Sequence, residues 1–131
     1  MEIHLKIIGA LLTLLSFVHV IFPKYFDWKK DLASLSLINR QMMIVHTFFI
    51  ALVVLLVGVL CLTSSSLLVT TELGKKICLG LAFFWGVRLV FQLFVYDSKL
   101  WRGKSFETVM HILFTIFWIY MTVIFAYIYL H

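Results

Sequence analysis

Four long apolar segments constrain the fold of this chain more than any other feature. They cover roughly residues 4–22, 41–62, 75–96 and 106–130. About 20 predominantly apolar residues are enough to carry an α-helix across the hydrocarbon core of a bilayer. The runs are continuous rather than alternating, which disfavours transmembrane strands. The sequence therefore predicts an all-α membrane protein, with residues 1–131 forming a single domain in which four transmembrane helices make an antiparallel bundle.

The composition leaves little of the chain for any other function. Of the 131 residues, 63% are hydrophobic and 13% are charged, and the net charge is +5 with neutral histidine. The basic residues flank the apolar segments, where anionic lipid headgroups lie. We therefore expect the lipid bilayer as the main partner and no binding of nucleic acid, while a redox partner or a second copy of the chain stays open.

Lys and Arg residues near the segment ends predict the orientation of the chain. Seven lie in the first and third links and three on the opposite side: Lys24, Lys29, Lys30, Arg40, Lys99, Arg102 and Lys104 against Lys6, Lys75 and Lys76. Basic residues are enriched in cytoplasmic links. We therefore expect both basic links in the cytoplasm and both termini on the outer side of an inner or plasma membrane.

The first link predicts a short interfacial helix between transmembrane helices 1 and 2. Trp28, Leu32 and Leu35 follow Asp27 at helical spacing, as in a helix that lies in the plane of the membrane surface. An aspartate in front of such a helix can cap its N-terminus. Pro23, just before this link, is expected to end the first transmembrane helix.

Three histidines lie on three different apolar segments, at similar predicted depths. His46 is six residues inside Arg40 and His111 seven inside Lys104, which corresponds to about 9–11 Å at 1.5 Å per residue. His19 lies four residues before Pro23, about 6 Å from the end of its segment. Ionisable side chains inside a membrane are costly and usually face a bundle interior. We therefore expect one polar layer near the cytoplasmic face.

Further polar residues recur at helical spacing in the same layer. Arg88, Gln92 and Tyr96 are four residues apart on the third segment, and Glu107 precedes His111 by four on the last, so each set shares one face of its helix. Small residues predict close approach of helices, and they are Gly9, Thr13, Ser16, Gly58, Gly80 and Gly86.

Haem b is the leading cofactor that this pattern predicts. The second and fourth helices of an antiparallel bundle run parallel and can lie diagonally, so that His46 and His111 could be the two axial ligands. Arg88 could pair with the propionates. His19, Gln92 and Tyr96 would complete the binding site, and the chain would belong to the membrane oxidoreductases.

Three alternatives stay open. A Cu, Fe or Zn ion could be held by His19, His46 and His111, with Glu107 as a fourth ligand or a proton acceptor. Arg88, as a catalytic or anchoring group, could instead bind the acceptor group of a quinone or another small substrate. The polar layer could also belong to a structural or assembly subunit without a cofactor, with a salt bridge between Arg88 and Glu107.

The two cysteines are a separate question. Cys61 and Cys78 flank the short link between the second and third segments. Cysteines in apolar helix ends usually behave as buried thiols, although an oxidising outer compartment would allow a disulfide.

Overall fold

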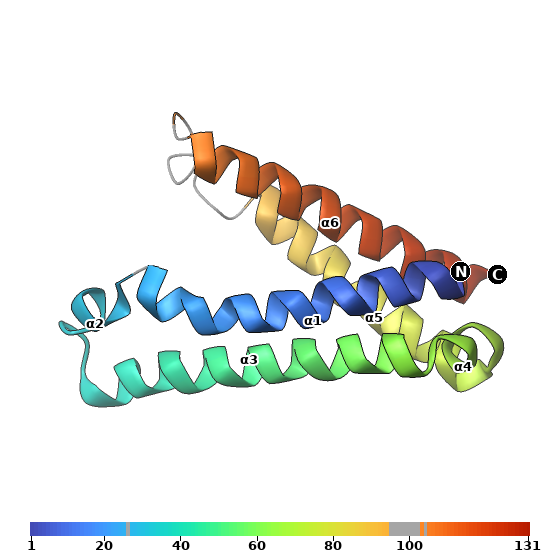
Figure 1. Ribbon diagram of the computed structural model, residues 1–131, viewed down its shortest axis with the longest axis horizontal. Coiled ribbons are helices and arrows are strands. Elements are labelled where there is room, and N and C mark those ends of the chain that lie inside the picture. Colours follow the sequence, from blue (N-terminus) through green and yellow to red (C-terminus); the bar gives the residue numbers. More distant parts are fainter. Residues whose placement is uncertain (26, 95–102, 104) are drawn as a thin grey trace. The chain divides into compact units, whose positions relative to one another are not determined.

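The computed structural model describes every residue except 26, 95–102 and 104. The described part of the chain forms six α-helices (Figure 1), which are α1 (Glu2–Tyr25), α2 (Trp28–Asp31), α3 (Leu37–Thr63), α4 (Ser65–Thr70), α5 (Glu72–Phe94) and α6 (Ser105–Leu130). No strand occurs among these residues. The all-α prediction is therefore confirmed.

Four of these helices are long and apolar enough to cross a membrane. Within the described residues they are Glu2–Ile21, Leu37–Thr63, Glu72–Phe94 and Ser105–Leu130. Each corresponds to one of the four predicted segments. The chain is accordingly a multi-pass membrane protein by the length and composition of its helices, while the side of the membrane on which its termini lie stays a prediction.

Hydrogen-bonding residues at the helix ends explain why these helices differ slightly from the predicted segments. α3 begins four residues early because Ser36 caps it, accepting a hydrogen bond from the backbone N–H of Asn39 at 3.4 Å. α1 continues past Pro23 to Tyr25, so the expectation that Pro23 ends the helix is wrong. Proline lacks the N–H that would bond to the carbonyl of His19, but its own φ suits a helix.

The link after α1 is helical over a shorter stretch than predicted. α2 is a single turn of four residues, and Asp27 in front of it has a left-handed backbone with φ of 52° and no side-chain capping hydrogen bond. The expected Asp27 cap is therefore wrong, because the side chain does not reach the backbone N–H groups of the turn. The position of α2 in the membrane interface stays a prediction.

The short helix α4 was not expected from the sequence, and Gly74 explains how it packs against α5. Thr71 accepts a hydrogen bond from the backbone N–H of Gly74 at 2.9 Å and so caps α5. A Cβ atom on Gly74 would collide with the backbone of Leu67 and Leu68 in α4. The sharp α4–α5 connection therefore requires glycine at this position.

The chain divides into two compact units, and residues 3–65 form the first of them. In this unit α1 and α3 lie side by side and run in opposite directions (Figure 1). A Cβ on Gly9 would lie 2.7 Å from the carbonyl oxygen of Gly58, and one on Gly58 would lie 2.8 Å from Thr13 Oγ1. The predicted close approach at Gly9 and Gly58 is therefore confirmed.

The other unit comprises residues 66–131 together with 1–2, and its main feature is the packing of α5 against α6. These two helices also run in opposite directions (Figure 1). Among the described residues, no atom lies within 4 Å of a Cβ built on Gly80, and Gly86 has an ordinary contact of 3.7 Å with Thr122. The sequence predicts a close helix approach at Gly80, and the described residues show none there.

The contrast between Gly58 and Gly80 gives a matched pair of alanine substitutions. Alanine is a better helix former than glycine by up to about 1 kcal/mol, so Gly80→Ala is expected to leave stability unchanged or raise it. Gly58→Ala forces apart α1 and α3 and is expected to cost about 1–3 kcal/mol, as overpacking does. Thermal unfolding followed by circular dichroism in detergent measures both. Equal Tm values for the two variants would contradict the close crossing.

Candidate functional site

The α5–α6 hairpin brings together the polar residues predicted on those two segments. Gln92 of α5 lies beside His111 of α6. Trp85, seven residues before Gln92, lies beside Trp118, seven residues after His111. At the other end of the hairpin, Lys75 Nζ donates a hydrogen bond to the carbonyl of His131 at 3.3 Å. The two helices are therefore in register along their length, with one polar site near the C-terminal end of α5.

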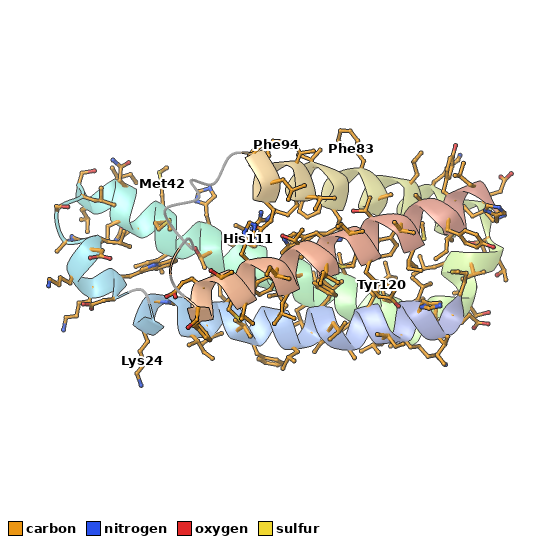
Figure 2. The ribbon with its side chains drawn as sticks, turned by 90° about the horizontal axis from the view of Figure 1, so that it is seen from above. Lys24, Met42, Phe83, Phe94, His111 and Tyr120 are labelled. Atoms are coloured by element: carbon orange, nitrogen blue, oxygen red, sulfur yellow. The ribbon has the colours of Figure 1, made fainter. Side chains whose placement is uncertain are left out.

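A chain of hydrogen bonds links Arg88, Gln92 and His111. Arg88 Nη1 donates to Gln92 Oε1 at 3.4 Å, and Gln92 Nε2 lies 3.1 Å from His111 Nδ1 and 3.5 Å from the carbonyl oxygen of His111. That same carbonyl accepts a 2.7 Å hydrogen bond from Thr115 Oγ1. Gln92 is 7% exposed, and Figure 2 shows His111 on the side of α6 that faces α5.

The chemistry of arginine fixes the direction of this chain. A guanidinium has donors and no acceptor, so the Gln92 atom that faces Arg88 is the amide oxygen, and the amide nitrogen donates to His111. His111 Nδ1 then accepts, and in the neutral imidazole the proton lies on Nε2. A histidine that ligates a metal shows the reverse arrangement, in which the second nitrogen donates its N–H. This site therefore favours His111 as a hydrogen-bond donor through Nε2 over His111 as a metal ligand.

Two stacked tryptophans lie next to Arg88. The rings of Trp85 and Trp118 are 4.8 Å apart and inclined by 11°, and each side chain is 4% exposed. Arg88 Cζ lies 5.3 Å from the centroid of Trp118, which is within cation–π range. Phe84 and Phe114 pack on the two indoles with centroid distances of 5.0 and 5.6 Å. The guanidinium is thus held by an amide oxygen and an aromatic face.

The sequence analysis did not identify the tryptophan pair as part of the site, although the spacing contained a signal. Trp85 precedes Arg88 by three residues and Gln92 by seven, which places all three on one face of α5. Among the described residues, no acceptor lies within hydrogen-bond distance of the indole N–H of Trp85 or of Trp118. A buried donor without a partner costs about 1–3 kcal/mol. The described part of the cluster therefore contains two indole donors without an acceptor.

His19 and His46 belong to the α1–α3 unit and have the opposite hydrogen-bonding arrangement. His19 Nδ1 donates to the carbonyl of Leu15 at 2.9 Å, and His46 Nδ1 donates to the carbonyl of Met42 at 2.7 Å. Because a carbonyl only accepts, the proton of each neutral ring lies on Nδ1 and the lone pair on Nε2. His46 is exposed and His19 half-buried.

The crossing of α1 and α3 relates the depths of these two histidines. His19 lies ten residues beyond Gly9, and His46 lies twelve before Gly58. At 1.5 Å per residue they are about 15 and 18 Å from the crossing, on the same side of it. The distances of these two histidines from the crossing therefore differ by about 3 Å. A layer that also includes His111 stays a prediction, because His111 belongs to the other unit.

The structure gives no support to a metal site. Among the residues it describes, no three His, Cys, Asp or Glu side chains gather as ligands of one ion would. Glu107 lies half-buried in the first turn of α6, where a carboxylate interacts favourably with the helix dipole. A metal ion bound by His19, His46, His111 and Glu107 thus stays a prediction from the sequence.

Two other expectations have simple outcomes. Tyr96 lies outside the described residues. Cys61 and Cys78 are buried thiols that form no disulfide in the described part of the chain, as expected for cysteines in apolar helix ends.

The two kinds of histidine can be told apart by the nitrogen that carries the proton. In protein labelled with ¹⁵N-histidine, we expect the neutral ring of His111 as the Nε2–H tautomer and the neutral ring of His46 as the Nδ1–H tautomer. Two-bond ¹H–¹⁵N couplings measure this, and single His→Gln variants assign each resonance. Gln92→Leu removes the donor to His111 and is expected to abolish the preference of His111 while leaving His46 unchanged. An Nδ1–H tautomer of His111 in the parent protein would contradict the hydrogen-bond order.

No protein-family model matches this chain, and searches of curated proteins and of solved structures found no similar protein either. The geometry of the site therefore carries the functional argument by itself.

Proposed function

We propose that this membrane protein binds a quinone, with Arg88 as the anchor for a quinone carbonyl. The observation that carries the proposal is the position of Arg88, which bridges the buried polar cluster and an apolar groove on α5. That groove has a volume of about 440 Å³ and is lined by Gly80, Phe83, Phe84, Val87, Arg88 and Phe91. Small-molecule sites typically measure about 300–1,000 Å³ and combine apolar walls with a few polar groups.

The two indole N–H groups without an acceptor in the described part of the hairpin support a ligand that brings acceptors. An indole N–H is a donor only, and no acceptor among the described residues bonds to that of Trp85 or of Trp118. A quinone supplies two carbonyl oxygens on a flat, neutral ring. The stacked indoles show that flat aromatic rings pack well in this part of the hairpin.

Removing the guanidinium tests the anchor. Hydrogen bonds to charged groups contribute about 1.5–3 kcal/mol, so Arg88→Leu is expected to raise the Kd of a tailless benzoquinone by roughly 10- to 100-fold. Quenching of tryptophan fluorescence in a Trp28→Phe, Trp101→Phe background measures binding, because the remaining indoles lie beside Arg88. Lys76→Leu is the matched control, since it removes an exposed cation from the same helix. Equal losses in both variants would contradict a specific role for Arg88.

Haem binding through His46 and His111 is the second candidate function. The hydrogen bond from His46 Nδ1 to the Met42 carbonyl favours it, because this tautomer leaves the lone pair on Nε2 as a ligating histidine requires. A haem held in this way would supply one-electron redox chemistry. The hydrogen bond from Gln92 to His111 Nδ1 counts against His111 as the other ligand.

An absorption spectrum of protein purified from haem-supplemented cells separates the two candidates. If Arg88 anchors a quinone and His111 is a donor, we expect no Soret band that depends on His111. A Soret band that disappears both in His46→Ala and in His111→Ala would support haem and would contradict the donor role of His111.

A further inference from the structure

Four basic residues, which we call the α1–α3 basic cluster, surround the connection between α1 and α3. They are Lys24 near the end of α1, Lys29 and Lys30 in α2, and Arg40 in the first turn of α3. The three lysines are exposed and Arg40 is half-buried. Within the described part of the chain, none of these four side chains forms a hydrogen bond or a salt bridge, even with Asp27 or Asp31 of the same connection. Their charge is therefore available to a partner.

The topology of the first unit brings this cluster to one surface of the membrane. Glu2–Ile21 and Leu37–Thr63 are each long and apolar enough to span it, and α1 and α3 run in opposite directions (Figure 1). The segment that joins two antiparallel spans lies at a single surface, and α2 belongs to that segment. Residues 3–65 contain one other Lys or Arg, which is Lys6 toward the opposite end of α1. The cations of this unit are thus concentrated at one end.

Exposed apolar side chains adjoin the cations. Leu35, Leu37 and Ile38 lie between α2 and Arg40 and are 39%, 61% and 62% exposed. Trp28 of α2 is half-buried, and tryptophan is enriched where a membrane meets water. Figure 2 shows Lys24 extending away from the ribbon, so that its apolar stem can follow a lipid while its ammonium group stays in water.

We propose that the α1–α3 basic cluster binds the phosphate headgroup of an anionic phospholipid, whose acyl chains contact Leu35, Leu37 and Ile38. Anionic headgroups attract Lys and Arg residues that lie at a membrane surface. A soluble phosphate or an acidic peptide would use the cations alone, whereas a phospholipid uses the cations and the apolar side chains beside them. Asp27 and Asp31 leave the connection with a net charge of +2, which suits a headgroup of one or two negative charges better than a polyanion.

Quenching of Trp28 fluorescence by brominated lipids measures this preference. The full chain is reconstituted in phosphatidylcholine bilayers that contain the same fraction of either brominated phosphatidylglycerol or brominated phosphatidylcholine. The quenching that is lost in Trp28→Phe isolates the lipid beside α2. We expect phosphatidylglycerol to be preferred by roughly tenfold in the parent protein, because each nearby cation contributes about fivefold. High salt is expected to lower this preference, since it screens exposed charges.

Matched variants assign the preference to the cluster. Lys29→Gln combined with Lys30→Gln is expected to bring the preference to within roughly twofold of parity. Lys29→Arg combined with Lys30→Arg keeps the charge and is expected to keep the preference. Lys6→Gln removes an exposed cation toward the opposite end of the same unit and is expected to change nothing.

Three results would overturn the proposal. Equal quenching by the two lipids in the parent protein would show that no anionic lipid is selected. A preference that survives in the glutamine pair would mean that these lysines only orient the chain during insertion. Loss of the preference in inorganic phosphate or hexaglutamate, but not in sodium chloride of the same ionic strength, would identify a site for a soluble anion. A preference that is lost in the arginine pair as well would attribute the effect to packing and would also contradict binding by charge.

Discussion

A guanidinium within an apolar helix has to be stabilised where it lies, and the α5–α6 hairpin is organised around this requirement for Arg88. The amide oxygen of Gln92 and the face of Trp118 stabilise it from two directions. Orienting the Gln92 amide toward Arg88 turns its nitrogen toward His111, and this determines which nitrogen of the imidazole accepts. The half-buried charge of Arg88 thus determines the hydrogen-bonding state of a residue on the neighbouring helix.

The two units achieve close helix packing by different means. In α1 and α3 the contact depends on the absence of side chains, because Gly9 and Gly58 bring the two backbones within about van der Waals distance. In α5 and α6 the contact depends on large flat rings, with Trp85 stacked on Trp118. Small residues leave no room for a ligand between α1 and α3 at their crossing. An aromatic interface next to a charged group is a more suitable place for a flat ligand.

Residue type and spacing alone could predict the features that depend on one helix or on two sequential helices. The helices follow from the length of the apolar runs, and the Arg88–Gln92–His111 contact follows from spacing on α5 and depth on α6. Local hydrogen-bond geometry could not be predicted in this way, which is why the roles expected for Pro23 and Asp27 are wrong. A layer of three histidines depends on how two units pack, and helical periodicity contains no information about that.

The hydrogen bonds divide the intramembrane histidines into two chemical kinds. His19 and His46 each donate from Nδ1 to a carbonyl of their own helix, an arrangement that any isolated helix could provide. His111 accepts from a side chain of the neighbouring helix, so its state depends on the α5–α6 contact remaining closed. A ligand that draws Arg88 away from Gln92 would free the amide to rotate, and the proton on His111 could then move to Nδ1. If the proposed quinone occupies the Arg88 site, its binding would therefore be coupled to the state of His111 through the amide group of Gln92.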